Sequence, residues 1–328
     1  MNDQDLERLL KSAGPRERPP AEVERAVRAG RYAEWQAMLR EGRSRKHRFG
    51  AFALAASLAV AAVGAWIAGT QTASTPAAVG TLAATVGNVR ERSGWLAGWR
   101  AMDGGDVVMA GRTLETGADG RAAIALAGGV SLRLDRGTRI AFIEPSRLRL
   151  ERGALYLDSG AGHLQPGRLL VETPAGTVRH VGTQYELRLL DAGMQLRVRE
   201  GRVEFRSPTG LVEHGRGGEQ LVIFGDGRVE RGMAPRSDPT WAWISDATPT
   251  VDLEGMSLAR FLAWAGRELG RDVELAGALT EADVAAVVIH GSTAGLPPAE
   301  ALEAVLETTR FQATLDGDRI LVERRDSI

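Results

Sequence analysis

An uncharged apolar run constrains this chain more than any other feature. From Phe49 to Gly69 the sequence contains no Asp, Glu, Lys or Arg. As a helix rising about 1.5 Å per residue, the run reaches about 31 Å, the thickness of one hydrocarbon core. The preceding stretch 43–48 is basic, whereas 70–78 carries no charge. The positive flank predicts a single transmembrane helix with the N-terminus in the cytoplasm and the C-terminal part outside.

A signal peptide or a buried core helix could also contain an apolar run of this kind. A cleaved signal peptide has a short leading region, but about 48 residues precede the run here. A buried core helix is compatible with the sequence, because the run is rich in Ala and Gly and therefore only moderately hydrophobic. A transmembrane helix at this position divides the chain into a small inner piece and a large outer piece.

The length and composition indicate how the outer piece is built. A chain of 328 residues corresponds to two or three domains. Glycine is frequent, with 40 residues, and aromatic residues make up only 5%, which favours short strands and turns. We expect a cytoplasmic segment 1–48, a transmembrane helix 49–69, a linker 70–78, a β domain 79–235 and a smaller α+β module 236–328.

Several classes of chemistry find no support in the sequence. The chain contains no Cys, which excludes disulfides and thiolate metal sites. None of the five His residues lies at metal-ligand spacing from another, and nucleophile, phosphate-loop and metalloprotease motifs are absent. The net charge is −1, and neither the N-terminal 48 residues nor the remainder of the chain contains a basic patch typical of nucleic-acid binding. We therefore expect no enzyme, no cofactor and no metal, and interpret the scattered Asp and Glu residues as solvated.

The cytoplasmic segment carries one candidate binding surface. Residues 5–11 predict a short helix, Pro15, Pro19 and Pro20 break it, and 21–41 predict a second helix. Apolar side chains at roughly helical spacing in this second helix form the candidate partner-binding stripe: Val23, Val27, Trp35, Met38 and Leu39. A segment of this size buries little on its own, so it either folds against a partner or is a poorly ordered tail.

Residues 79–235 have the pattern of an all-β domain. Apolar residues alternate with polar ones in short runs every eight to ten residues or so, and Gly or Asp-Gly turns separate the runs. Examples of the alternation are Ala122, Ile124 and Leu126, then Val130, Leu132 and Leu134. No helical pattern of useful length interrupts this region. The pattern predicts a mainly β fold, as a sandwich, a roll or a solenoid-like stack.

The same region resembles the FecR family. The stretch 170–187, LVETPAGTVRHVGTQYEL, is similar to the family's central motif, with Tyr where Phe is usual. The stretches 105–106, 198–203 and 218–219 resemble its opening, its "V-x-E-G-x-V" motif and its closing "aGE". The motif residues, which we interpret as structural, are Gly105, Asp106, Thr173, Pro174, Gly176, Gly182, Thr183, Tyr185, Glu200, Gly201, Gly218 and Glu219.

The C-terminal residues predict a compact α+β module. Leu258, Phe261, Leu262, Ala265 and Leu269 follow at helical spacing, between a candidate N-cap at Ser257 and a stop signal at Gly270. Short strands are expected at 251–253, 273–275 and 287–290, a second helix after Pro297, and a hairpin around Asp316-Gly317-Asp318. This order resembles the short N-terminal domain of secretins and TonB-dependent receptors.

The FecR resemblance implies a signalling role. It implies an inner-membrane regulator whose cytoplasmic segment binds an extracytoplasmic-function sigma factor. Its periplasmic part then senses a TonB-dependent outer-membrane receptor, as in the control of iron and siderophore uptake, with proteolytic release of the cytoplasmic piece as one route. The family's cytoplasmic domain is usually longer, at about 80 residues. The alternatives are a membrane-anchored module that binds a periplasmic protein or glycan without transcriptional output, and a periplasmic hydrolase that no motif favours.

Overall fold

The computed structural model describes residues 22, 76–94, 96–160 and 169–325. Apart from Glu22, these residues belong to one compact unit, Thr75–Ile328. The candidate stripe Val23, Val27, Trp35, Met38 and Leu39 and the predicted transmembrane run 49–69 lie outside the described residues.

Within the described part of the chain, no helix combines the length and the hydrophobicity that crossing a bilayer requires.

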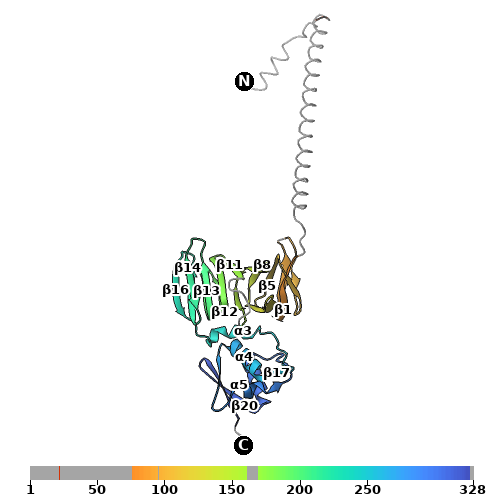
Figure 1. The fold of residues 1–328 in the computed structure, drawn as a ribbon. Coiled ribbons are helices and arrows are strands. Elements are labelled where there is room, and N and C mark those ends of the chain that lie inside the picture. The colour runs from red at the N-terminus through yellow and green to blue at the C-terminus, as the bar shows by residue number, and fades with distance from the viewer. Residues whose placement is uncertain (1–21, 23–75, 95, 161–168, 326–328) are drawn as a thin grey trace, which may run out of the picture. The chain divides into compact units, whose positions relative to one another are not determined.

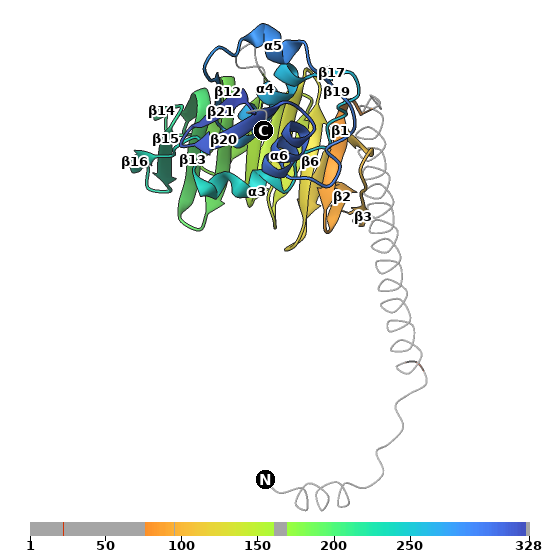
Figure 2. The same ribbon diagram turned by 90° about the horizontal axis from the view of Figure 1, so that it is seen from below.

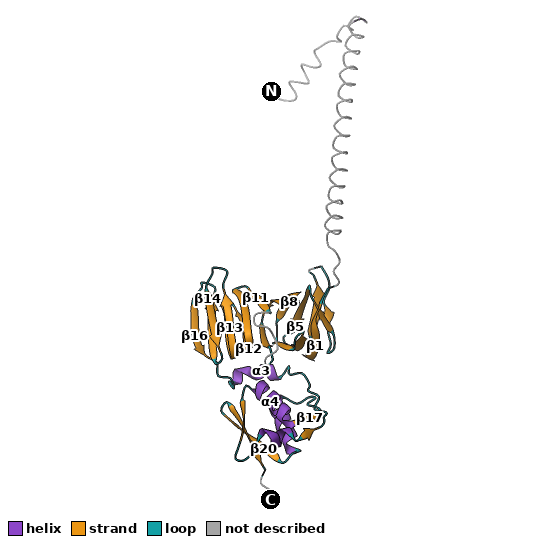
Figure 3. Cartoon of the chain, in the orientation of Figure 1, coloured by secondary structure: helices purple, strands orange, loops and turns teal. Residues whose placement is uncertain are grey.

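Residues 78–233 contribute sixteen strands that belong to one hydrogen-bonded sheet (Figures 1 and 3). The strands, in chain order, are β1 (Ala78–Val86), β2 (Val89–Ser93), β3 (Arg100–Ala101), β4 (Val107–Met109), β5 (Arg112–Thr116), β6 (Arg121–Leu126), β7 (Val130–Leu134), β8 (Arg139–Glu144), β9 (Arg147–Arg152), β10 (Ala154–Asp158), β11 (Leu170–Thr173), β12 (Gly176–Leu190), β13 (Gly193–Arg206), β14 (Val212–Arg216), β15 (Glu219–Phe224) and β16 (Val229–Met233).

Two long strands divide this sheet into two halves. The first part of β12 pairs with β11 and its last part with β10, while the first part of β13 pairs with β15 and its last part with β14. Half-sheet A therefore runs β3-β2-β5-β8-β9-β11 to the start of β12, the end of β13 and β14. Half-sheet B runs β4-β1-β6-β7-β10 to the end of β12, the start of β13, β15 and β16.

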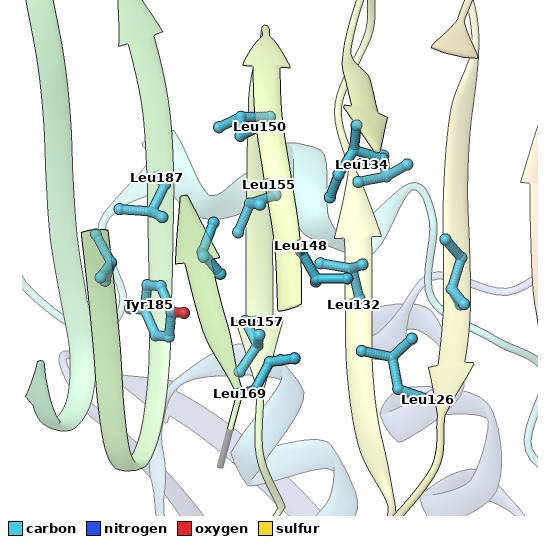
Figure 4. Close-up of a cluster of buried hydrophobic side chains, with 14 of the residues drawn as sticks. Leu126, Leu132, Leu134, Leu148, Leu150, Leu155, Leu157, Leu169, Tyr185 and Leu187 are labelled. Atoms are coloured by element: carbon cyan, nitrogen blue, oxygen red, sulfur yellow. The ribbon is translucent and has the colours of Figure 1, made fainter. Parts of the chain in front are cut away.

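The two half-sheets share one hydrophobic core. Leu148 and Phe205 from half-sheet A join Leu132, Leu157 and Leu187 from half-sheet B in a single cluster, and all five are fully buried. Figure 4 shows leucines of this cluster lying between strands of the two halves. Because side chains alternate along each strand, the intervening residues point outward from both halves. The observed fold is a sheet folded on itself.

The prediction of a mainly β domain is confirmed. No helix occurs in the described residues between 79 and 235. The prediction of uniformly short strands is wrong for β12 and β13, with 15 and 14 residues. Each of these continues through a register shift into the other half-sheet, so segments that read as separate strands belong to one.

The C-terminal part contains short helices and two small sheets. Its elements are η1 (Pro239–Trp241), α3 (Ala242–Ser245), β17 (Met256–Ser257), α4 (Leu258–Leu269), β18 (Asp272–Leu275), α5 (Glu281–Ala285), β19 (Val288–Ile289), α6 (Pro298–Glu307), β20 (Phe311–Asp316) and β21 (Arg319–Arg324). Strands β18, β21 and β20 form a three-stranded sheet and β17 pairs with β19. The apolar faces of α4 and α6 close a second hydrophobic core with these strands.

Most of the elements expected in this module are present. The Ser257 side chain accepts a hydrogen bond from the Arg260 N–H at the start of α4, and Gly270 ends the helix with φ of 65°. The strand expected at 251–253 is reduced to a single bridge between Asp252 and Ser292. Helix α5 was not predicted, although Thr280 and Asp283 form a capping box at its start.

Candidate functional site

The outward face of half-sheet B carries charged side chains that the solvent does not reach. Arg133 on β7, Tyr156 on β10 and Glu186 on β12 lie side by side across neighbouring strands. These three side chains are almost fully buried, as are Asp158 and Arg199 nearby on β10 and β13. The C-terminal module covers them, as Figure 2 shows with the module in blue in front of the strands. The interpretation of these strand-borne carboxylates as solvated is wrong here.

Arg133 makes the central contact between the sheet and the module. Its two terminal nitrogens donate to the two carboxylate oxygens of Glu268 near the end of α4, at 2.8 and 2.6 Å. It also donates to the Ile244 carbonyl at 3.1 Å. Burial would lower the pKa of Arg133, but the Glu268 carboxylate raises it above its ordinary value, so the guanidinium stays charged. A planar guanidinium matches a carboxylate in this bidentate geometry.

Side chains of the sheet also satisfy the C-terminal carbonyls of α4. The last four carbonyls of a helix have no partner within it. Arg199 donates to the Glu268 carbonyl at 2.9 Å, and Gln184 donates to the Arg267 carbonyl at 3.3 Å. Gly270 is needed beside them, because a Cβ there would lie 2.2 Å from Nε of Arg199. The end of α4 is therefore seated directly on strands β12 and β13.

A second ion pair lies next to the first. Arg267 on α4 binds Asp158 on β10, with Nε 2.9 Å from Oδ2. The same guanidinium contacts Glu200 on β13 at 3.3 Å. Burial would lower the pKa of Arg267, but Asp158 and Glu200 raise it. Two arginine–carboxylate pairs thus cross the boundary between the sheet and the module. The sheet supplies the arginine of the first pair and the carboxylate of the second.

Aromatic residues of the connector complete the contact. Trp241 is buried against Tyr156, with ring centroids 6.2 Å apart in an edge-on arrangement. The guanidinium of Arg197 stacks 3.9 Å above the Trp241 ring. Both tryptophans of this connector, residues 237–249, are buried. We call the whole contact the joint and define it by Arg133, Tyr156, Asp158, Gln184, Arg199, Trp241, Arg267, Glu268 and Gly270.

A neighbouring cluster extends the joint along half-sheet B. Asp135 accepts from Arg121 at 3.0 Å and from Arg188 at 2.9 Å, and Arg121 also pairs with Asp246 in the connector. Burial would raise the pKa of Asp135, but a backbone hydrogen bond from Arg136 and the two arginines lower it below its ordinary value. The carboxylate is therefore charged at neutral pH and holds two arginines in place.

The family-motif residues at the centre of the domain lie where the long strands change half-sheets. The register of β12 against β13 shifts between Val181 and Gln184, and Gly182 and Thr183 occupy this bend opposite Gly201, while Glu200 pairs with Gln184. Gly201 has φ of 82°, and a Cβ there would lie 2.2 Å from the Gly182 carbonyl. Two bulges side by side bend both strands together.

Thr183 contributes to the bend through its backbone. Its N–H donates to the Ser159 hydroxyl at 2.7 Å, and its carbonyl accepts from the Ser159 N–H at 3.1 Å. The Thr183 hydroxyl has no hydrogen-bond partner among the described residues. Glu200 faces the joint through Arg267.

The other motif residues occupy turns and the core. Thr173, Pro174 and Gly176 form the β11–β12 hairpin, where the Thr173 hydroxyl donates to the Gly176 carbonyl at 2.9 Å. Tyr185 is fully buried between the half-sheets. The remaining four residues lie at the ends of strands: Gly105 and Asp106 before β4, Gly218 in the turn before β15, and Glu219 as the first residue of β15.

Eight of the twelve motif residues lie within a match to a known family. Residues 112–204 match the model of the family described as "FecR protein". The chain contains a FecR domain. The match runs from β5 into β13 and includes the bend and the β11–β12 hairpin; the whole β domain that contains it, residues 78–233, is called the FecR domain below.

Two solved structures are similar to this chain over 65% of its length and 98% of their own. Both are crystal structures of a "putative anti-sigma factor" from Parabacteroides distasonis ATCC 8503, at 16% sequence identity. Their TM-scores of 0.34 and 0.35 are too low to carry an argument about this chain. Among the curated proteins, no relative matches.

The FecR domain presents a second charged face, on the outside of half-sheet A. No hydrogen bond or ion pair between described residues joins this face to the C-terminal module. Arginines dominate its outward positions and Glu115, Glu172 and Glu204 are interspersed among them. We call it the arginine face and define its basic residues as Arg90, Arg92, Arg139, Arg147, Arg149, Arg152, Arg179, Arg202, Arg206 and Arg216.

The joint and the arginine face are built from ion pairs, hydrogen bonds and aromatic contacts. No group of His, Asp or Glu among the described residues is placed to hold a metal ion. The charged residues of the joint were missed by the sequence analysis, because a polar outward position has the same sequence pattern whether water or another domain covers it. One signal was available: β10 reads ALYLD and is buried on both faces, which indicates a strand that is covered twice.

Proposed function

We propose that this chain is a FecR-type regulator anchored in the bacterial inner membrane. Residues 1–48 bind an extracytoplasmic-function sigma factor in the cytoplasm, residues 49–69 span the membrane, and residues 79–328 lie in the periplasm. There they recognise the signalling domain of a TonB-dependent outer-membrane receptor. The FecR match over residues 112–204 is the observation that carries the proposal. The basic flank before an uncharged run supports the orientation.

The joint supports a role for the C-terminal module in the regulation. The module is attached to the FecR domain by buried ion pairs and by the capped end of α4, and not only by a linker. A receptor that binds the module therefore acts on a body that includes strands β12 and β13. Removing one partner of a buried ion pair is costly, so the attachment resists partial opening.

The proposal is tested by co-purification of the tagged full-length chain from membranes. Trp35 is the expected anchor of the cytoplasmic stripe, because large aromatic residues dominate such contacts. Trp35→Ala should weaken binding of the sigma factor by about 2 kcal/mol, or roughly thirtyfold. Gln36→Ala, which lies about 100° around the same predicted helix from Trp35 and is not an apolar member of the stripe, should leave binding unchanged. Reporter fusions after Arg48 and after Ser237 check that both variants keep their orientation in the membrane.

The outcome separates two functions. Recovery of a sigma factor with the wild type and with Gln36→Ala, but not with Trp35→Ala, supports the regulator. If no sigma factor is recovered with the wild type in any inducing state, the regulator proposal fails. The chain is then a membrane-anchored module that binds a periplasmic protein or glycan, and deleting residues 1–42 should leave transcription unchanged.

A further inference from the structure

The arginine face has more positive charge than its own carboxylates can neutralise. Glu115 is shared among Arg90, Arg139 and Arg152, at 2.7, 2.5 and 3.7 Å. Glu172 pairs with Arg147 and Arg149. Both carboxylates therefore already serve two or three guanidinium groups, and a surplus of positive charge remains on this side of the FecR domain.

The surplus is concentrated where β12, β13 and β14 lie side by side. Arg179, Arg202 and Arg216 are exposed, and their guanidinium groups have no carboxylate partner among the described residues. Glu204, the acidic residue between them, is engaged by Arg206 at 3.2 Å and faces His214 at 3.6 Å. The guanidinium groups of these three arginines are therefore available to donate hydrogen bonds to a bound anion.

The strand register places two of these arginines directly opposite each other. Arg202 on β13 is the cross-strand partner of Arg216 on β14. Like charges in this arrangement repel and destabilise the pair of strands, unless an anion lies between them. A bound phosphate group could accept hydrogen bonds from both guanidiniums and remove the repulsion. The geometry is suited to a phosphate-bearing ligand.

The reach of the chain identifies the source of that phosphate. The linker 70–78 spans at most about 30 Å when fully extended. A folded domain the size of 79–235 has a radius of gyration of about 15 Å. A FecR domain tethered in this way therefore stays within contact distance of the bilayer, whose headgroups form a broad anionic plane. A broad face of many arginines fits such a plane better than it fits one small ligand.

We propose that the arginine face binds the anionic phospholipid headgroups of the membrane in which the chain is anchored. This inference rests on the proposed membrane anchor. It assigns the two faces of the FecR domain different occupants: the C-terminal module on half-sheet B and the lipid surface on half-sheet A. Each arginine near an anionic bilayer increases the binding constant roughly fivefold.

The test uses the full chain in lipid nanodiscs and exploits its lack of native cysteine. A dye is attached at Val212→Cys, which lies opposite Arg206 on the arginine face. A matched dye at Val288→Cys, exposed on β19 of the C-terminal module, is the control. Discs of phosphatidylcholine are compared with discs that also contain phosphatidylglycerol, and a spin-labelled headgroup lipid quenches any dye that touches the surface.

We expect quenching at position 212 in the phosphatidylglycerol discs alone and no quenching at position 288. High salt should remove the effect, because it screens exposed charges. Replacing Arg179, Arg202 and Arg216 together by Gln should abolish the quenching, whereas replacing all three by Lys should retain it. The Lys variant and a thermal melt of both variants exclude a loss of folding as the cause.

Several results would overturn the proposal. Equal quenching at both positions, or none at position 212 in phosphatidylglycerol discs, contradicts a lipid-facing arginine face. Protection of the 212 dye by added polyglutamate, without any effect of lipid, would assign the face to a soluble acidic polymer instead. If the chain does not enter nanodiscs, the membrane anchor itself is wrong. Flotation of the chain with vesicles of the same lipids then still tests directly whether the arginine face binds anionic lipid.

Discussion

The two outward faces of the FecR domain begin from the same strand pattern and end in opposite environments. On half-sheet B, Arg133 and Asp158 are buried under the C-terminal module and bind Glu268 and Arg267 across the joint. On half-sheet A, no described residue outside the domain pairs with the arginine face. The comparison shows that charged residues at alternate positions identify an outward face without showing what covers it.

The difference in covering changes what each charge contributes to stability. Exposed ion pairs, such as Arg149 with Glu172, contribute about 0–1 kcal/mol, because water screens them. Removing one partner of a buried pair strongly destabilises the folded protein, because the remaining charge is buried without compensation. The predictions below separate the two faces by this criterion.

The largest effect is expected for Glu268→Ala in the joint. It leaves the guanidinium of Arg133, which is 2% exposed, without its carboxylate. We expect a loss of about 3–5 kcal/mol in the free energy of unfolding. The matched change Glu172→Ala on the arginine face should cost about 1 kcal/mol or less. Thermal unfolding of the full chain in mild detergent measures both losses. Equal losses would show that water screens the ion pair in the joint as it screens the exposed one.

A smaller effect is expected for Gly270→Ala at the end of α4. A left-handed backbone costs a residue with a Cβ about 1–2 kcal/mol, and the new Cβ would also displace Arg199. We expect a loss of about 2 kcal/mol or more. Gly277→Ala is the control, because Gly277 has the same φ of 65° with no atom near its Cβ position. If the two variants have the same melting temperature, the contact of Arg199 with the end of α4 does not contribute to stability.

The smallest effect concerns pH and compares one carboxylate from each face. Arginine partners lower the pKa of Asp135 on half-sheet B and of Glu115 on the arginine face, although burial alone would raise both. A lowered folded-state pKa stabilises the protein above the unfolded-state pKa of about 4. This stability is lost as the pH falls through the folded-state pKa.

Asp135→Asn and Glu115→Gln should each therefore reduce stability at neutral pH and flatten its decline below about pH 4. High salt should weaken the contribution of Glu115 more, because its partner Arg90 is 43% exposed whereas Arg121 beside Asp135 is 9% exposed. Melting temperatures across this pH range provide the measurement. An unchanged slope in Asp135→Asn would mean that its arginines do not hold the charged form.

Local features of the fold could be predicted from the sequence. The apolar spacing of α4, its cap at Ser257 and its stop at Gly270 are set by neighbours within four residues. The hairpin at Gly317 and the alternating strands of the FecR domain are equally local. Helix α5 could have been found from its capping box, but its five residues carry too little periodicity to stand out.

Features that depend on distant contacts could not be predicted. Arg133 and Glu268 are 135 positions apart, and neither neighbourhood indicates that the two side chains meet. The continuity of β12 through its bend was hidden because Gly182 resembles a turn that ends a strand. Trp35 and its stripe remain a prediction, since they lie outside the described residues.

The hairpin of β12 and β13 also bears on how the domain assembles. Leu190 pairs with Gly193, so the two longest strands are joined by a connection of only two residues. Such a local pairing loses little chain entropy on closing, whereas β1 must find β6 across a much longer loop. Since this one hairpin supplies strands to both half-sheets, we expect it to form early and to act as the template for each. The halves should then fold as one cooperative unit, and a slow step in one should delay the other.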